Sequence, residues 1–420
     1  MNRIGFKSGY LQYFNANKIT QMPFRRHRRS GSMDMPGILL SLPERNYWRP
    51  YALFIATPRH ATYRPSMTRR LASVDALRGC TVAAMLLVND PGDWGHVYAP
   101  LEHSAWHGCT PTDLVFPFFL FLVGLSCALG IEPRAAQVGQ RAALTRAALL
   151  RALRIVALGL AINVLAWLIM PGVHLRAPGV LQRIGLCFAA TALFAIHTRP
   201  RTQWAAIVAI LLGYWGSLAL GGSLEPWVNL ASRSDSAIFG PLVYQIDPLS
   251  GRGHDPEGLL ATLPSLATCL LGLCAGRWLR EDKLKPLLTG AMAAIALSAV
   301  WSLALPLNKN LWTSSFALWC GGWAALATLL FHWLIDRRGW PAVGRRFGVN
   351  AIAAYAGSEL MQILLPGLGW QEALYQRGFA GWITPLAGPH IASLAFAVAF
   401  VALWWLIVYA MDKRRWYLKL

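Results

Sequence analysis

A short polar stretch between two apolar runs holds side chains that can catalyse proton or group transfer. It contains three histidines and two acidic residues: His96, Glu102, His103, His107 and Asp113. A neutral imidazole with a pKa of about 6.5 can take a proton from an attacking amine or hydroxyl, or accept an acyl group itself. His103 is the first candidate for this role. The alternative is that these histidines cap a helix or bind water.

The apolar run before this stretch carries polar residues at both of its ends. Asn89 ends the run, where its amide could donate to an oxyanion or orient a histidine. Its alternative role is a helix C-cap before Asp-Pro-Gly. Asp75 and Arg78 begin the run three residues apart, so they share a helix face and are expected to form an ion pair. The alternative for this pair is contact with an anionic cofactor.

Two further sites place polar side chains among apolar residues. Arg183, beside Gln182, falls inside a predicted membrane span, where a charge is costly and marks a functional site by default. Its expected partner is Asp113, Asp75 or a phosphate-bearing ligand. The second site is a dense patch of polar side chains at a helix start: Asn308, Lys309, Asn310, Ser314 and Ser315. Capping accounts for one or two of these five residues, but not for all.

The elements that must position these residues are membrane-spanning helices. The chain has 420 residues, of which 55% are hydrophobic and only 14% are charged, whereas globular proteins carry about 25% charged residues. The apolar residues come in blocks of about 20, the length of a membrane-spanning helix. The sequence therefore predicts an all-α polytopic membrane protein with ten spans: 72–89, 113–131, 149–169, 179–197, 203–220, 258–277, 286–305, 313–334, 348–366 and 390–411.

The basic residues are distributed unevenly between the loops. If loop 90–112 is external, the external loops carry five of them: Arg176, Arg233, Arg252, Lys309 and Arg377. The internal segments after the first span carry nineteen: Arg134, Arg141, Arg146, Arg151, Arg154, Arg199, Arg201, Arg277, Arg280, Lys283, Lys285, Arg337, Arg338, Arg345, Arg346, Lys413, Arg414, Arg415 and Lys419. Positive charge marks the cytoplasmic side. Both termini are therefore predicted to be cytoplasmic and His103 external, and the net charge of +20 needs no nucleic acid to explain it.

The first 66 residues differ in composition from the rest. They are polar and rich in arginine and contain no apolar core of a signal peptide, which predicts a disordered basic extension at 1–66 and a transmembrane domain at 67–420. Met67 is an alternative start. The seven cysteines show no metal-binding spacing, so neither a zinc site nor an intrachain disulfide is expected.

Seven segments in order from residue 70 to about 355 resemble the heparan-α-glucosaminide N-acetyltransferase family and its bacterial relatives, which are multi-span acyltransferases. The segments are RLASVDALRG, the apolar run ending in Asn89, EHSAWHGCTPTDLVFPFFLFLVG, GVLQRIG, DPEGLLATLPSLATCLLG, NKNLWTSSFAL and FGVNAIAAY. The resemblance implies cytosolic acetyl-CoA as acyl donor and a sugar amine on the far side of the membrane as acceptor. It implies an active histidine in the motif His103, Trp106 and Gly108, with Asn89 in the same site. His107 stands where the family commonly has Asn.

The polar residues singled out above, with others of the predicted external loops, form two groups of candidates. The candidates for binding acetyl-CoA or lining its path are Asp75, Arg78, Gln182, Arg183, Asn308, Lys309, Asn310, Ser314 and Ser315. The candidates for binding the sugar or glycan acceptor are Glu102, Trp106, His107, Asp113, Asp255 and Glu257. A homodimer in the bacterial inner (plasma) membrane is implied as well. The alternatives are a transporter or flippase of a glycan or lipid-linked sugar, and a structural membrane scaffold.

Overall fold

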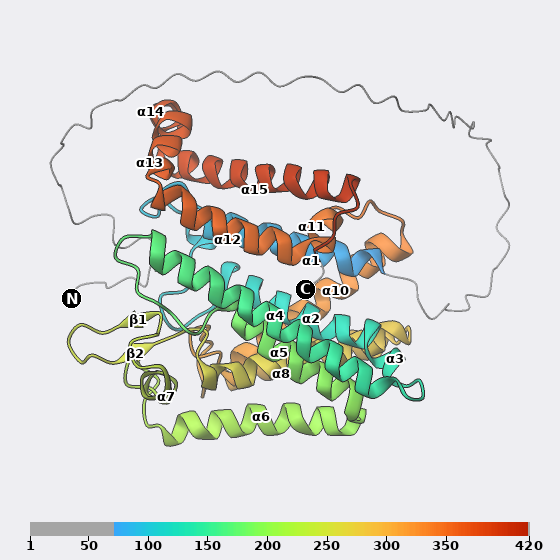
Figure 1. Ribbon diagram of the computed structural model, residues 1–420. Coiled ribbons are helices and arrows are strands. Elements are labelled where there is room, and N and C mark those ends of the chain that lie inside the picture. Colours follow the sequence, from blue (N-terminus) through green and yellow to red (C-terminus); the bar gives the residue numbers. More distant parts are fainter. Residues whose placement is uncertain (1–70, 419–420) are drawn as a thin grey trace, which may run out of the picture. The chain divides into compact units, whose positions relative to one another are not determined.

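Long helices that reverse direction from one to the next make up most of the computed structural model, which describes residues 71–418 (Figure 1). The long helices are α1 (Ala72–Asn89), α2 (Val115–Gly130), α4 (Gln140–Ile169), α5 (Val180–His197), α6 (Pro200–Leu220), α8 (Leu259–Arg280), α9 (Leu284–Trp301), α10 (Ser314–Phe331), α12 (Ala351–Gly367) and α15 (Pro389–Lys413). The predicted extension at 1–66 lies outside the described residues.

Short elements connect the long helices. The short helices and helical turns are η1 (Ala99–Leu101), η2 (Thr112–Leu114), α3 (Glu132–Ala135), α7 (Leu230–Phe239), η3 (His332–Arg337), α11 (Arg345–Val349), α13 (Trp370–Tyr375), η4 (Gln376–Ala380) and α14 (Gly381–Ala387). Two strands of two residues each, β1 (Gln245–Ile246) and β2 (Gly253–His254), pair antiparallel. The all-α polytopic fold predicted from the sequence is confirmed.

The predicted spans agree with the helices, with two informative differences. In the described residues, nine helices are long and apolar enough to cross a membrane, and the tenth candidate is α12 together with the segment Trp370–Ala387, bent by 95°. Pro366 and the left-handed backbone of Gly369 (φ 71°) end α12 at this bend. Helix α4 begins nine residues before the predicted 149, because hydropathy does not detect its polar first turns with Arg141 and Arg146.

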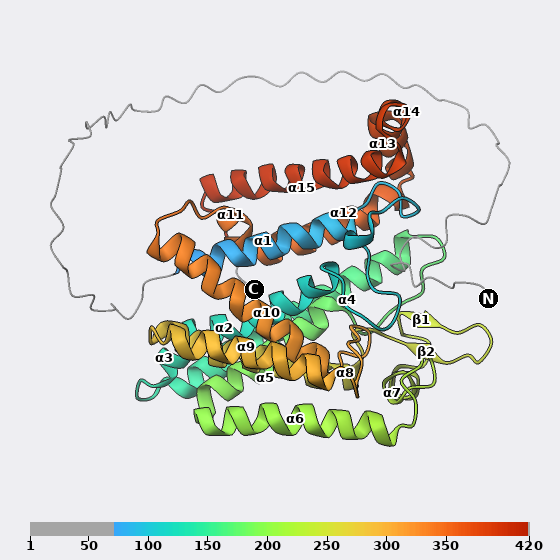
Figure 2. The same cartoon turned by 180° about the vertical axis from the view of Figure 1, so that it is seen from behind.

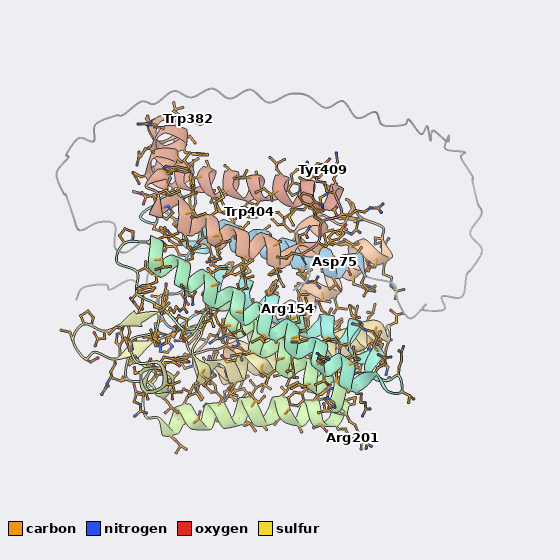
Figure 3. The ribbon with its side chains drawn as sticks, viewed as in Figure 1. Asp75, Arg154, Arg201, Trp382, Trp404 and Tyr409 are labelled. Atoms are coloured by element: carbon orange, nitrogen blue, oxygen red, sulfur yellow. The ribbon has the colours of Figure 1, made fainter. Side chains whose placement is uncertain are left out.

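The loops gather at the two ends of the helices. Strands β1 and β2 and helices α7, α13 and α14 lie at one end, and α3 lies at the other (Figure 1). Asp75 and Arg201 lie toward the α3 end, whereas Trp382 lies at the opposite end (Figure 3). Helix α4 is in front in the first view, and α9 and α10 are in front in the reverse view (Figure 2). We call the end with β1, β2 and α7 the loop end, because it carries the elaborate connections.

Helices α2 and α8 approach each other closely at glycine positions. A Cβ atom on Gly272 would lie 1.9 Å from the carbonyl oxygen of Phe121, and one on Gly124 would lie 1.7 Å from that of Cys269. Small residues let helix backbones meet in a membrane, where packing replaces the hydrophobic effect as the driving force. This contact places Asp113, just before α2, near the segment that leads into α8.

The substitution Gly272→Ala should therefore force the two helices apart. We expect destabilisation of about 1–3 kcal/mol, the usual range for overpacking, measured as a lower thermal unfolding midpoint in detergent. Gly213→Ala is the matched control, because a Cβ atom there meets nothing within 4 Å. Equal midpoints for the two variants would show that the α2–α8 contact is not tight.

Candidate active site

A buried carboxylate organises the polar loop between α1 and α2. Asp113 lies in η2 and is 0% exposed. Its Oδ1 atom is 2.7 Å from Nδ1 of His103. Its Oδ2 atom accepts hydrogen bonds from the Ser104 amide at 3.1 Å, and from the Thr110 amide and hydroxyl at 2.9 and 3.1 Å. Because four donors converge on it, the carboxylate holds both the loop backbone and the His103 ring in place.

His103 also contacts a lysine from a distant loop. Nζ of Lys309 lies 3.0 Å from Nε2 and 3.1 Å from Nδ1 of His103, and 4.0 Å from Oδ1 of Asp113. Burial and the neighbouring Lys309 charge lower the pKa of His103, although the Asp113 carboxylate acts in the opposite direction. Burial also lowers the pKa of Lys309. A neutral His103 therefore donates its Nδ1 proton to Asp113 and carries a lone pair on Nε2, as a general base requires.

The residues of the His103 motif anchor this loop to its neighbours. The buried Trp106 donates from Nε1 to the Leu224 carbonyl at 3.0 Å, which ties the loop to the long connection before α8. Gly108 donates from its amide to the Leu307 carbonyl at 2.7 Å, with a φ of 119° that favours glycine. Two of the three motif residues thus position the loop.

The connection that carries Lys309 is rigid. Asn308 is fully buried, its Oδ1 atom accepts from the Leu311 amide at 2.8 Å, and its own backbone amide donates to the Thr313 hydroxyl at 3.1 Å. Asn308 also contacts Nδ1 of His107 at 3.4 Å. These bonds fix the backbone that presents Lys309 to His103.

A cavity of about 230 Å³ opens beside this cluster. Of the predicted site residues, the following line it: Asn89, His103, Asp113, Gln182, Glu257, Lys309 and Asn310. They come from α1, the loop before α2, the start of α5, the segment before α8 and the connection before α10. The structure thus brings His103 together with polar residues that are up to about 220 positions apart in the sequence.

An ion-pair cluster forms a second wall of the cavity. Arg176 binds both Asp255, with Nε to Oδ2 at 2.8 Å, and Glu257, and its guanidinium lies 4.6 Å from the centre of the Tyr244 ring. Asp255 also accepts from the Tyr244 amide at 2.9 Å. Glu257 lines the cavity, whereas Asp255 holds the two loops together behind it.

Two more carboxylates line the cavity. Asp90 is 7% exposed and accepts from the Gln362 amide at 3.0 Å, and Glu359 faces the same space from α12. Burial and the negative charge of Glu359 raise the pKa of Asp90 well above its usual value. Among residues 71–418, no basic side chain forms an ion pair with either carboxylate.

The remaining predicted residues lie away from the cavity. Asp75 and Arg78 form the expected ion pair at 3.1 Å, and Arg78 also bonds Ser126. At about 1.5 Å per residue, Asp75 is roughly 20 Å along α1 from Asn89. Ser314 and Ser315 are fully buried and donate to the carbonyls of Leu211 and Leu305, which explains them as helix-packing contacts.

Arg183 is fully enclosed behind the cavity wall. It donates to the Gly258 carbonyl at 3.2 Å and lies 5.1 Å from the centre of the Trp312 ring. Its Nε and Nη1 atoms are buried with no hydrogen-bond partner among the described residues. Glu102 and His107 are exposed in the His103 loop and do not line the cavity.

Sequence reasoning missed several residues of the site: Asp90, Asn163, Arg176, Tyr244, His254, Glu359 and Gln362. Asp90 directly follows Asn89, and His254 directly precedes Asp255. Both therefore neighbour a predicted site residue in the sequence, which could have marked them as candidates. Arg176 is one of few basic residues in the predicted external loops. No local pattern marks Asn163 or Gln362, since only the packing of α4 and α12 brings them to the cavity.

These features define a polytopic α-helical membrane protein with a buried Asp–His–Lys cluster beside a cavity lined by both polar and apolar side chains. The profile of the family described as "Heparan-alpha-glucosaminide N-acetyltransferase, catalytic" matches residues 70–307. The chain belongs to this family.

Two curated proteins are similar over most of the chain. Both carry the name heparan-alpha-glucosaminide N-acetyltransferase. The mouse (Mus musculus) protein is 25% identical over 87% of this chain and 63% of its own length, and the human (Homo sapiens) protein is 27% identical over 86% and 61%. The matched region thus spans somewhat under two thirds of each relative.

The charge of Lys309 should set the titration of His103. Lys309→Gln removes a cation that lowers the pKa of His103, so this pKa should rise and the neutral imidazole should be lost at a higher pH than in the wild type. The pH dependence of His103 modification by diethyl pyrocarbonate, read by mass spectrometry, measures this shift. Lys283→Gln is the control, because Lys283 pairs with Glu281 between α8 and α9. An unchanged His103 titration in Lys309→Gln would contradict the contact.

Proposed function

We propose that this protein is a membrane-embedded N-acetyltransferase that moves an acetyl group from acetyl-CoA to the amine of an amino sugar or glycan. The observation that carries the proposal is the His103 imidazole held between the Asp113 carboxylate and the Lys309 ammonium in a cavity wall. Membership of the family supports the same activity. Acetyl-CoA is a substrate in this account, and the acceptor is the second substrate.

The chemistry needs one base and one electrophile. Acetyl transfer to an ammonium acceptor forms a C–N bond and breaks the C–S bond of the thioester. Of the two protons that the acceptor nitrogen loses, one protonates the thiolate leaving group to give the thiol and the other is released. Nε2 of His103 accepts the first proton to free the nucleophilic amine, and Asp113 stabilises the imidazolium that results, which can pass this proton to the thiolate. Nζ of Lys309 lies 3.0 and 3.1 Å from the two ring nitrogens of His103, so the acceptor displaces it from Nε2, and the displaced ammonium donates to the thioester oxygen as negative charge develops.

Asn89, at the end of α1, is a further candidate for binding the substrates beside His103 and Lys309. It lines the same cavity as His103 and Lys309. Its amide can donate a second hydrogen bond to the thioester oxygen or hold the acceptor. This role agrees with the one that the family resemblance implies for Asn89.

The charge of the cavity suits a cationic acceptor. The carboxylates of Asp90, Glu257 and Glu359 line it, while its two permanent cations, Arg176 and Lys309, already contact Glu257 and Asp113. An amino sugar enters as an ammonium ion, and its positive charge favours ionisation of the buried Asp90 carboxyl and an ion pair with it. Arg176 and Lys309 are already engaged by carboxylates, so the described cavity wall offers no further basic side chain to the phosphates of CoA, which favours the donor entering elsewhere.

The donor is assigned to the cytoplasmic side and the acceptor to the external side of a bacterial inner membrane. This assignment follows from the distribution of basic residues, which makes the loop end external. Arg183, two of whose buried donor atoms have no partner among residues 71–418, and its neighbour Gln182 in the cavity wall are candidates for contact with the donor. Asp75 and Arg78 are candidates at the opposite end of α1, and a homodimer is proposed from the resemblance alone.

A glycan transporter is the competing function. A polar cavity among membrane helices suits a transported sugar as well as a reacting one. The buried Asp113–His103 pair favours the enzyme, since transport requires no general base. Glycan movement across proteoliposomes without acetyl-CoA would favour the transporter.

Replacement of His103 tests the proposal directly. His103→Ala should lower the transfer of labelled acetyl from acetyl-CoA to glucosamine by about 10²–10⁴-fold, the usual contribution of a general base, while CoA binding persists. His96→Ala is the matched control, because His96 lies in the same loop, pairs with Asp93 and does not line this cavity. Normal activity of His103→Ala would refute the assignment.

The role of His103 as an acetyl carrier is a separate alternative. If acetyl-His103 forms, labelled acetyl should be trapped on the protein when no acceptor is present. Direct transfer from acetyl-CoA predicts no trapped label under conditions that support turnover. Mass spectrometry of the peptide that contains His103 distinguishes the two mechanisms.

A further inference from the structure

A second histidine lies in the wall of the same cavity. His254, at the end of β2, lines the cavity and is 1% exposed. Its Nδ1 atom lies 2.9 Å from Oγ of Ser232 in α7. Its Nε2 atom is buried and has no hydrogen-bond partner within the described part of the chain. A buried polar atom without a partner is destabilising, so its presence in a cavity wall indicates a ligand that satisfies it.

The hydrogen bonds of α7 leave one ring nitrogen of His254 for a ligand. Ser234 and Ser236 in the same helix donate to the carbonyls of Leu230 and Gly253. Among the described residues, the Ser232 hydroxyl has Nδ1 of His254 as its hydrogen-bond partner. Nδ1 is therefore engaged by a hydroxyl that can donate or accept, and Nε2 is the ring atom left without a partner among these residues. Burial lowers the pKa of His254 to about 4, so the ring is neutral at physiological pH.

Aromatic contacts hold this ring in one orientation. The Trp106 ring lies 5.4 Å from it at 64°, and the Trp227 ring lies 6.2 Å from it at 90°. Trp227 has a φ of 67°, which is rare for a bulky residue and indicates a constrained backbone. Because Trp106 belongs to the His103 loop, it links the position of His254 to that of His103.

A neutral ring here is suited to one kind of ligand. Its uncharged Nε2 atom adds no positive charge to a wall that already holds Arg176 and Lys309, so it does not further repel an ammonium group. Lys309 already supplies a charged donor next to His103. His254 therefore serves a part of the acceptor away from the reacting amine, and hydroxyl groups, which both donate and accept hydrogen bonds, are its natural partners.

We propose that Nε2 of His254 forms a hydrogen bond with a hydroxyl group of the acceptor, so that His254 distinguishes an amino sugar from an amine without hydroxyl groups. The inference rests on the proposed function, because it names a specificity residue of the same cavity. His254 is a binding residue in this account and takes no proton during transfer.

Binding without acetyl-CoA tests the subsite independently of turnover. The probes are glucosamine and cyclohexylamine, an amine on a six-membered ring without hydroxyl groups, titrated calorimetrically into the full-length protein in detergent. His254→Phe should bind glucosamine about tenfold more weakly, as expected for the loss of one hydrogen bond. Its affinity for cyclohexylamine should equal that of the wild type. His254→Gln retains a hydrogen-bonding group near the Nε2 position and should recover most of the affinity for glucosamine.

The proposal would be overturned if His254→Phe bound glucosamine as tightly as the wild type does. It would also be overturned if the variant lost affinity for glucosamine and cyclohexylamine equally, or if the wild type bound no glucosamine. A second measurement does not require the variant to fold. The wild type should bind one monodeoxy analogue of glucosamine about tenfold more weakly than the others, and equal affinity for all analogues contradicts the subsite. Selective binding by a wild type that transfers no acetyl group would support the subsite and refute the proposed function.

Discussion

The buried carboxylate of Asp113 is the constraint on which the rest of the site depends. A charge with no exposed surface is stable only when hydrogen-bond donors surround it. The amides of Ser104 and Thr110 and the ring of His103 meet this need, so the loop must close around Asp113. The same closure turns Nδ1 of His103 inward and leaves Nε2 for Lys309 and for a substrate.

The packing of the helices holds connections that are distant in the sequence against this loop. The glycine contacts between α2 and α8 bring the start of α2 near the segment that carries His254 and Glu257. The Gly108–Leu307 and Trp106–Leu224 hydrogen bonds then join three connections at the loop end. A membrane helix has all its backbone groups satisfied internally, so irregular polar structure of this kind collects where protein or water surrounds it.

The sequence predicted the fold well and the site in part, for a physical reason. Apolar blocks of membrane length identify helices without knowledge of their packing, so the polar start of α4 and the bend that follows α12 were missed. His103, Asp113 and Lys309 were each candidates, but no rule of spacing places residue 309 beside residue 103. Asp90, His254 and Glu359 acquire their significance from burial in a shared cavity, which local sequence does not encode. Ser314 and Ser315 were predicted to bind acetyl-CoA, but they are buried serines that donate to backbone carbonyls. In the local sequence, serines of these two kinds cannot be told apart.

The central claim is that His103 and Asp113 act as one catalytic unit. A double-mutant cycle on kcat/KM for acetyl transfer, with His103→Ala, Asp113→Asn and the double variant, measures this coupling most directly. The account predicts that the double variant is no slower than His103→Ala alone, because Asp113 acts through the imidazole. Losses that multiply in the double variant would show that the two residues act independently and would contradict the account.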